Sequence, residues 1–258
     1  MNHCQPMNRD NSYDRIAHWY DVDMARNMPF DDVAFYVGVS ASRGGRVLEL
    51  GCGNGRILLE LLARGIDAFG VDRSARMLEN LCAKARARAL PVRACRMDVR
   101  ALGFRGDFAV VLCPYSLVTY MAGERDVSRL LDEVARVLAR RGALVIDAFI
   151  PRTATTAGEF REDYRRACGE HTLARSKRIR VLPPRLNRIE RRYQLLSVQG
   201  ELLEQVDTTE HIQTFTPEEL QATIAGVGFT TEETWFDYHS HDATAEAQFF
   251  TIVARKAG

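Results

Sequence analysis

The residues of this sequence that could bind a ligand stand at the ends of three short apolar runs. A glycine-rich segment at 51–55 follows the first run, which carries Glu49, and glycines allow a tight turn and the close approach of a ligand. Asp72 ends the second run, 21 residues after Gly51, the distance at which a βαβ unit presents a carboxylate to a ribose. Asp98 follows the third run and is a candidate acceptor for an exocyclic amine such as that of adenine. Together these acids predict a nucleoside-binding site.

The spacing of the glycines, GxGxG, differs from the GxGxxG of dinucleotide-binding folds. Asn54 and Arg56 also stand where such a fold keeps the start of its helix small to receive a pyrophosphate. We therefore expect a ligand without phosphates, and a nicotinamide-dependent dehydrogenase is a weak alternative. The same residues also have a plain structural interpretation, as a tight turn, a helix N-terminal acid and a loop residue.

The elements that must position these residues alternate between short β-branched runs and helical periodicity over residues 45–151, which is typical of βαβ units. Thr216, Pro217 and Glu219 supply the cap and first turn of a later helix. The pattern predicts an α/β fold with a doubly wound, seven-stranded, mostly parallel sheet and a terminal antiparallel hairpin. Strands are predicted at 46–50, 67–71, 92–95, 107–113, 143–149, 229–238 and 248–254, and helices from the glycine turn to 64, after Ser74, from 127 to 142 and from 217 to 227.

Residues 152–215 have a different pattern, a short helix around 158–168 followed by two or three long alternating strands. We interpret this segment as an inserted antiparallel β lid. Residues 171–192 carry eight Lys and Arg against one Glu, and residues 199–219 carry six acids and no Lys or Arg. These charges cancel locally, which does not favour a nucleic-acid partner. A turn at Gln199-Gly200 would place Arg192 opposite Asp207, Tyr193 opposite Val206 and Arg188 opposite His211.

Three segments resemble the motifs of the class I S-adenosylmethionine-dependent methyltransferases. Residues 47–56 are similar to the family's first motif, 72–77 to its second and 96–99 to its third. The resemblance implies a Rossmann-like core that binds S-adenosyl-L-methionine and yields S-adenosyl-L-homocysteine. Asp72 would then hold the ribose hydroxyls, Met77 would pack on the adenine and Asp98 would meet its amino group. The cofactor-binding residues that it implies are Tyr13, Tyr20, Glu49, Gly51, Gly53, Gly55, Asp72, Arg73, Met77, Asp98, Val99 and Cys113.

The N-terminal segment at 13–21 resembles the YDxIAxxYD sequence of many bacterial members that methylate small molecules, in which it closes over the cofactor. Its pattern is also that of an amphipathic helix with Ile16, Trp19 and Tyr20 on one side, so simple packing is an equal alternative. The chain reads Cys-Pro-Tyr-Ser at 113–116, unlike the Asp/Asn-Pro-Pro-Tyr/Phe of members that act on DNA bases or a glutamine amide. We therefore expect neither of those acceptors.

Methyl transfer from a sulfonium is an in-line displacement, so the main tasks are to hold the reacting atoms about 3 Å apart and to exclude water. A neutral amine or thioether needs no base, whereas a hydroxyl or thiol gains from one. The candidate catalytic residues are His211, Tyr115 and His18. The strand position of His211 after Glu210 could turn its side chain toward the cleft, and its alternative is a surface position opposite Arg188.

Composition narrows the function further. The formal net charge is +1, and no apolar run approaches the roughly 20 residues that a membrane span needs. The polar residues 1–14 lack the pattern of a signal peptide, so we expect a cytoplasmic protein. The six cysteines include no CxxC pair, so no metal site is expected.

The expected organisation is an N-terminal helical cap (1–42), a Rossmann-like methyltransferase core (43–151 and 216–258) and the lid (152–215). We predict an S-adenosylmethionine-dependent methyltransferase that transfers a methyl group to N or O of a small-molecule metabolite. It would act as a monomer or homodimer without a membrane partner. The alternatives are a macromolecular methyltransferase, acting on RNA or protein, and a non-catalytic relative that only binds the cofactor.

Overall fold

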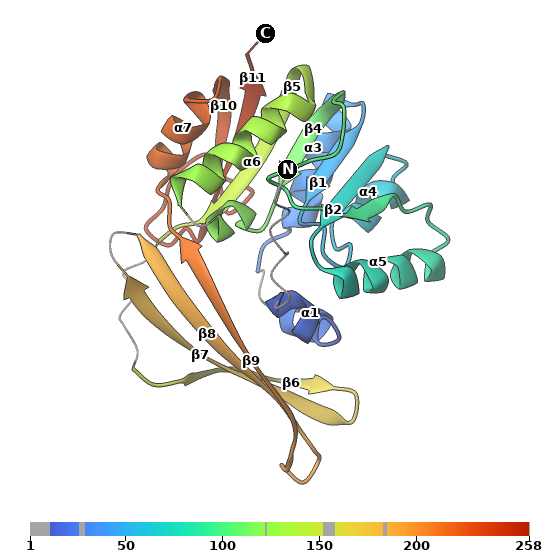
Figure 1. The fold of residues 1–258 in the computed structure, drawn as a ribbon, viewed down its shortest axis with the longest axis vertical. Helices are drawn as coiled ribbons and strands as arrows, with labels where there is room; N and C mark the ends of the chain where they lie inside the picture. The colour runs from blue at the N-terminus through green and yellow to red at the C-terminus, as the bar shows by residue number, and fades with distance from the viewer. Residues whose placement is uncertain (1–10, 26–28, 122, 152–157, 183–184, 258) are drawn as a thin grey trace, which may run out of the picture.

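The computed structural model describes residues 11–25, 29–121, 123–151, 158–182 and 185–257, and it contains two β-sheets. The larger sheet has seven strands in the order β10-β11-β5-β4-β1-β2-β3, and the smaller has four in the order β6-β7-β8-β9 (Figure 1). The strands of the larger sheet are β1 (Val47–Leu50), β2 (Ala68–Asp72), β3 (Ala94–Arg96), β4 (Phe108–Cys113), β5 (Leu138–Phe149), β10 (Phe229–Phe236) and β11 (Phe249–Lys256).

Strands β1 to β5 are parallel, and β11 pairs antiparallel with both β5 and β10. Because β1, β2 and β4 are parallel, their carboxyl ends meet at one edge of the sheet. The strand order reverses beside β1, which is where such sheets bind ligands. Strands β1 and β4 are buried almost throughout, as strands covered on both faces should be. The predicted fold, with its terminal antiparallel hairpin, is confirmed.

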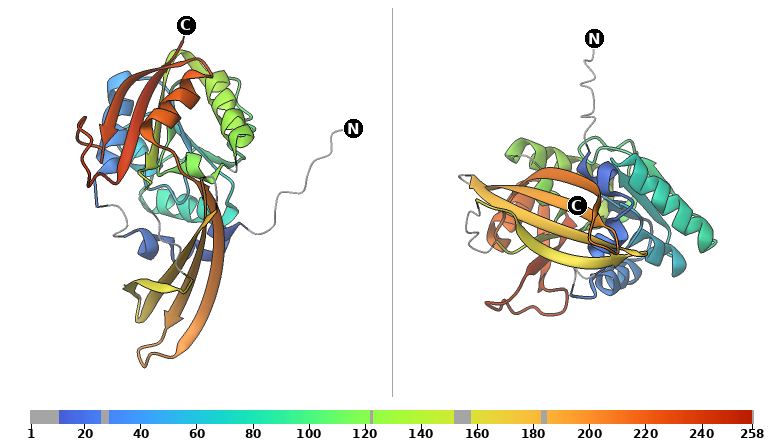
Figure 2. Two further views of the ribbon diagram at one scale, coloured as in Figure 1. Left: turned by 90° about the vertical axis from the view of Figure 1, so that its left-hand side faces the viewer. Right: turned by 90° about the horizontal axis from the view of Figure 1, so that it is seen from below.

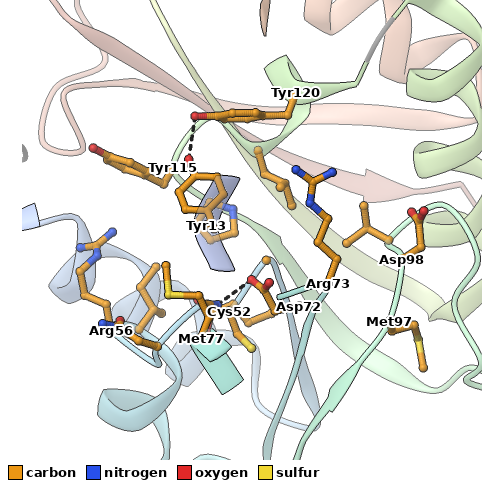
Figure 3. Close-up of a pocket in the computed structure, with 18 of the residues that line it drawn as sticks. Tyr13, Cys52, Arg56, Asp72, Arg73, Met77, Met97, Asp98, Tyr115 and Tyr120 are labelled. Atoms are coloured by element: carbon orange, nitrogen blue, oxygen red, sulfur yellow. Dashed lines mark hydrogen bonds between the residues drawn. The ribbon is translucent and has the colours of Figure 1, made fainter. Parts of the chain in front are cut away.

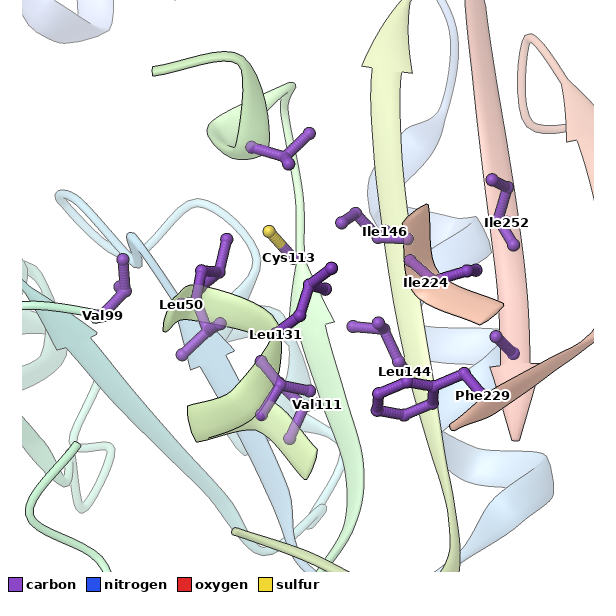
Figure 4. Packing of buried hydrophobic residues seen from close by; sticks show 14 of the residues in the cluster. Leu50, Val99, Val111, Cys113, Leu131, Leu144, Ile146, Ile224, Phe229 and Ile252 are labelled. Carbon is purple, nitrogen blue, oxygen red and sulfur yellow. The ribbon is translucent and has the colours of Figure 1, made fainter. Parts of the chain in front are cut away.

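Helices cover both faces of this sheet. One face carries α6 (Glu124–Val137) and α7 (Pro217–Ala225), whose Leu131 and Ile224 pack against Val111 and Leu144 of the strands (Figure 4). The other face carries α3 (Asp32–Arg43), α4 (Leu58–Ala63) and α5 (Ala75–Ala87). The N-terminal caps of α5 and α7 are the ones predicted from the sequence. The Ser74 hydroxyl accepts from the backbone N–H of Met77, and Thr216 and Glu219 form a capping box.

The four-stranded sheet extends from the core as a separate curved layer (Figures 1 and 2). Its strands pair antiparallel in sequence order, and the three predicted cross-strand pairs occur, with an Arg192–Asp207 ion pair of 2.9 Å. Part of the predicted lid, residues 152–157, lies outside the described residues, and the domain boundaries stay predictions. The strands are β6 (Arg161–Cys168), β7 (His171–Leu182), β8 (Leu186–Leu196) and β9 (Leu202–Gln213).

Two sequence-based predictions of secondary structure in the core and the lid are wrong. The segment around 158–168 is not a helix but contains β6, which turns at Gly169 (φ +63°) into a hairpin with β7. Helix α6 ends at Val137 rather than at residue 142, because Leu138 already pairs with Phe108 and the next four residues bulge out before pairing resumes. Strand pairing across the sheet thus overrides the local pattern at both places.

The N-terminal segment forms two short helices, α1 (Ser12–Ile16) and α2 (Tyr20–Met24), instead of one. Ile16 and Trp19 are buried against the lid residues Leu173, Tyr193 and Val206, so the packing alternative holds for these two residues, and Tyr20 does not join this cluster. A four-residue 3₁₀ helix, η1 (Leu117–Tyr120), follows β4. Among the described residues, no helix is both long and apolar enough to cross a membrane.

Candidate active site

The carboxyl ends of β1, β2 and β4 open into a cavity of about 310 Å³, which we call the donor cavity. Its wall includes ten of the twelve residues that the sequence pointed to, from the N-terminal helices, the glycine turn and the loops after β2 and β3 (Figure 3). These ten are Tyr13, Tyr20, Glu49, Gly51, Gly53, Asp72, Arg73, Met77, Asp98 and Val99. These residues are far apart in the sequence, and the parallel strands bring them together at one edge of the sheet.

Gly55 and Cys113 do not line the donor cavity. A side chain at Gly55 would meet Leu59 at 2.9 Å and Leu81 at 3.0 Å, so this glycine lets the turn pack against α4 and α5. Cys113 is fully buried in the core below the site, and the next residue, Pro114, faces the cavity instead. Both positions therefore support the wall and do not form it.

Asp72 is held in place by backbone groups. One carboxylate oxygen accepts from the N–H of Gly53 (2.9 Å) and the other from the N–H of Ser74 (2.7 Å). Burial raises the pKa of Asp72, and these two hydrogen bonds oppose that rise. Each oxygen keeps a further lone pair, so a fixed acceptor lines the cavity where the sequence placed a ribose contact.

Glu49 has unused capacity for a hydrogen bond. Its side chain is buried at 2% exposure, and Oε2 has no hydrogen-bond partner. Burial raises the pKa of Glu49 to about 8. A buried oxygen without a donor is costly, so this wall of the donor cavity fits a ligand that brings an N–H or O–H group.

Asp98 lies in the donor cavity but already has a partner. The Arg100 guanidinium donates to both of its carboxylate oxygens, at 2.7 and 3.0 Å, and also donates to Asp126 of α6 at 2.7 Å. The hydrogen bonds from Arg100 lower the pKa of Asp98. A contact between Asp98 and an adenine amino group stays a prediction, and it would have to share these oxygens. The sequence analysis missed Arg100 and Asp126. Arg100 could have been considered, because it stands only two residues after Asp98 and its side chain can reach that carboxylate.

A second cavity of about 420 Å³ lies between the N-terminal helices and the lid sheet, and we call it the lid cavity. It shares four tyrosines with the donor cavity: Tyr13, Tyr20, Tyr115 and Tyr120. The sequence analysis did not identify the lid residues that line this cavity. The alternating pattern of one strand does not show which side chains of the neighbouring strands and of the N-terminal helices face it. That side consists of Asp163, Tyr164, Arg166, Arg175, Lys177, Arg191, Tyr193 and Glu210.

The four shared tyrosines form the junction between the two cavities. The hydroxyls of Tyr13 and Tyr120 are 2.8 Å apart, and their rings meet edge to face with centroids 6.2 Å apart (Figure 3). Burial raises the pKa of Tyr13 and Tyr20 above the usual range for tyrosine and raises the pKa of Tyr115 to about 12. Tyr115 therefore keeps its proton near neutral pH, and the structure does not support its predicted role as a base.

The two candidate histidines lie outside both cavities. His211 is exposed on β9 and pairs across the strands with Arg188, because its neighbour Glu210 takes the inward position of the alternating strand. His18 is also exposed, beside Trp19 and 3.8 Å from Glu204. These positions do not support a role for either histidine as a base, and for His211 the surface alternative is the one observed.

Asp147 of β5 holds the turn that carries Tyr115. Its buried carboxylate accepts from the N–H groups of Tyr115 and Ser116 and from the hydroxyls of Tyr36 and Tyr238. Tyr115 and Ser116 both have positive φ, +55° and +57°, a strained conformation for residues other than glycine. The carboxylate thus compensates for the strain and fixes Tyr115 at the junction.

The N-terminal helices are tied to both the core and the lid. On the core side, Asp14 accepts from the Ser74 hydroxyl at 2.6 Å. On the lid side, Asp23 is buried and contacts the Arg175 guanidinium and the hydroxyls of Tyr164 and Tyr193. These contacts fix the segment that carries Tyr13 and Tyr20 over the cavities.

Comparison with known proteins shows the fold and points to a family. A family model described as "Methyltransferase domain" matches residues 47–142. This match covers less than half of the chain and supports a class I S-adenosylmethionine-dependent methyltransferase. A Bacillus subtilis protein named "Putative methyltransferase YqeM" is 34% identical over 137 residues, which are 52% of this chain and 54% of that protein. The chain thus spans about half the length of the curated relatives it matches.

Solved structures with the same fold match nearly the whole chain. The CcbJ methyltransferase of Streptomyces caelestis has a TM-score of 0.80 at 20% identity, covering 98% of this chain and all of the other. The amino pentose methyltransferase CalS10 of Micromonospora echinaspora, solved with S-adenosylmethionine bound, has a TM-score of 0.70 at 21% identity, covering 99% and 100%. The comparisons support S-adenosylmethionine as the cofactor, and the donor cavity fits it through Asp72 and the unpartnered oxygen of Glu49.

Proposed function

We propose that this chain transfers a methyl group from S-adenosylmethionine to a nitrogen or oxygen atom of a small polar molecule held in the lid cavity. The observation that carries the proposal is the junction, because the same four tyrosines line the donor and lid cavities. With the cofactor in the donor cavity and the acceptor in the lid cavity, the methyl group and the atom that receives it would meet at these rings. The names of relatives agree, since one solved neighbour is called an amino pentose methyltransferase.

The residues of the donor cavity would hold the cofactor by hydrogen bonds and packing. Asp72 would accept from the ribose hydroxyls, the Glu49 carboxyl group would take a donor of the ligand, and Met77 would pack against an aromatic base. The bound cofactor supplies an electrophilic methyl group. The protein orients the two ligands and excludes water, which accounts for much of the rate of a displacement between fixed partners.

The alternatives fit the site less well. An RNA methyltransferase would use the Arg-rich lid as a docking surface, but Arg178, Arg188 and Arg192 are each paired with an acid of the same sheet. A relative that only binds the cofactor would have no use for a second cavity joined to the first. A methyl acceptor in the lid cavity explains both features.

Calorimetric titration with S-adenosylhomocysteine, with NADH in parallel, tests the proposal. We expect the first to bind and NADH not to bind. Asp72→Ala should weaken binding of S-adenosylhomocysteine at least about 100-fold, since it removes an anchored acceptor of two hydroxyls. Asp67→Ala, just before the other end of β2, is the control and should leave the affinity unchanged. Equal affinity of Asp72→Ala and the wild type would refute the ribose contact, and absence of binding to the wild type would refute the proposed function.

A further inference from the structure

The junction between the two cavities is lined by the faces and edges of tyrosine rings. Tyr13 meets Tyr20 with centroids 6.1 Å apart and an interplanar angle of 72°, and it meets Tyr120 at 6.2 Å and 63°. Tyr115 completes the wall on the side of the β4 loop (Figure 3). Aromatic faces attract cations within about 6 Å of the ring centroid, and cages of such rings recognise alkylammonium groups.

Most of the charged groups on the lid side of the junction have partners of opposite sign. On the lid side, Glu210 pairs with Arg191, and Asp23 and Asp163 both pair with Arg175. The lid cation Lys177 also binds Asp163, and Arg166 donates to the carbonyl oxygens of Val22 and Asp23. On the donor side, Arg56 forms a two-bond ion pair with Asp32. The wall of the lid cavity thus has four cations against three acids, and the Arg56 guanidinium carbon also lies 5.6 Å from the ring centroid of Tyr115.

A base that could take a proton from a hydroxyl or thiol is missing from the described lid-cavity wall. That wall contains no histidine, its three acids are each bound to arginine, and burial raises the pKa of five of its six tyrosines above the usual range. Glu49, whose side chain is free on one oxygen, lines the donor cavity and not the lid cavity. An acceptor in this cavity must therefore be able to attack without first losing a proton to the protein.

The charge balance of the reaction selects among such acceptors. When an uncharged amine attacks, its lone pair forms the N–C bond, the C–S bond breaks, and the bonding pair stays on sulfur. The positive charge moves from the sulfonium to the new ammonium group, and its proton is lost to solvent after release. A single positive charge thus remains beside the rings throughout, where their faces stabilise it. Transfer to an alkoxide would instead cancel the charge, and the rings would then stabilise reactants over products.

We infer that the methyl acceptor is the uncharged nitrogen of an aliphatic amine and that Tyr13, Tyr20, Tyr115 and Tyr120 form the cage that holds the ammonium product. The inference rests on the proposed methyl transfer and names the acceptor class of the same site. Tyr120 is the best single probe of the cage, because it lies on η1 and touches both cavities.

Two probes of equal shape separate the cage from ordinary apolar binding. Choline carries a trimethylammonium group, and 3,3-dimethyl-1-butanol replaces it with an uncharged tert-butyl group. Each is titrated by NMR into protein saturated with S-adenosylhomocysteine, which leaves the acceptor side open and brings no sulfonium. We expect choline to bind about 10-fold more tightly than its neutral analogue, the effect of a desolvated cation beside several rings.

Variants of Tyr120 show whether the ring faces cause this difference. Tyr120→Phe keeps the ring and should keep most of the preference for choline, whereas Tyr120→Leu should reduce it to about 3-fold or less. Equal affinity of the two probes, tighter binding of the alcohol, or no saturable binding of choline would each overturn the inference. These outcomes are distinct from failure of S-adenosylhomocysteine to bind, which would refute the proposed function instead.

Discussion

The pKa of Glu49 makes the stability of this protein depend on pH in a way that one substitution should remove. Burial raises this pKa from 4.5 to about 8, and the side chain is only 2% exposed. Below pH 4.5 the carboxyl group is protonated in both the folded and the unfolded chain. Between pH 4.5 and 8 the unfolded chain releases the proton but the folded protein keeps it, so stability falls as pH rises through this window.

The size of the effect follows from the shift. Each unit of pKa is worth about 1.4 kcal/mol, so the free energy of unfolding should fall by up to about 4 kcal/mol between pH 5 and pH 9 through Glu49 alone. Glu49→Gln keeps the shape of the side chain but cannot ionise. Urea denaturation of both proteins at pH 5, 7 and 9 measures the difference, and curves that stay parallel across this range would refute the reasoning.

Ligand binding should reveal the same proton. S-adenosylhomocysteine carries an ammonium group, and a cation in the donor cavity favours the ionised form of Glu49. At pH 7 about nine-tenths of the free protein carries the proton, so binding should release close to one proton. Calorimetry in phosphate and in Tris, whose ionisation enthalpies differ, counts it. Release of the same number by Glu49→Gln would mean that another group titrates.

Two further predictions concern groups away from the ligands. Asp147→Asn should lower the free energy of unfolding by about 2–4 kcal/mol, because the charged acceptor of four buried donors is lost. Tyr36→Phe removes one of these donors and should cost about 1 kcal/mol; equal losses in urea denaturation would contradict this account. His211→Ala should leave both the stability, within about 0.5 kcal/mol, and the affinity for S-adenosylhomocysteine unchanged. A loss of affinity for S-adenosylhomocysteine would mean that His211 contributes to the ligand-binding site.

Much of the donor cavity could be predicted because its residues follow directly after strands. The carboxyl ends of parallel strands meet at one edge, so the spacing between Gly51 and Asp72 already implied that they lie together. The hydrogen bond between Gly53 and Asp72 confirms this placement. The three pairs predicted between β8 and β9 also occur, but the predicted two-residue turn does not: residues 197–201 connect the strands, and a register shift between Leu195 and Leu196 restores the predicted pairing.

The lid cavity could not be predicted in the same way. Its wall joins residues from α1, η1 and the lid strands, far apart in sequence, such as Tyr13, Tyr120 and Arg191. No local pattern relates them, because the packing of α1 and α2 between the core and the lid brings them together. For the same reason the sequence left His211 as a candidate beside its surface alternative, because its direction depends on which face of the lid sheet turns inward.

The sequence by itself thus determined the class of fold, the resemblance to methyltransferases and most of the donor cavity, because glycines, caps and alternating apolar residues act over a few positions. The tertiary structure decided which side chains meet at the junction, which acids are neutralised by arginine, and that both histidines stay outside. Those properties depend on burial and on distances between elements that are not neighbours in the chain. The chemistry of the acceptor depends on them, and a local pattern does not contain them.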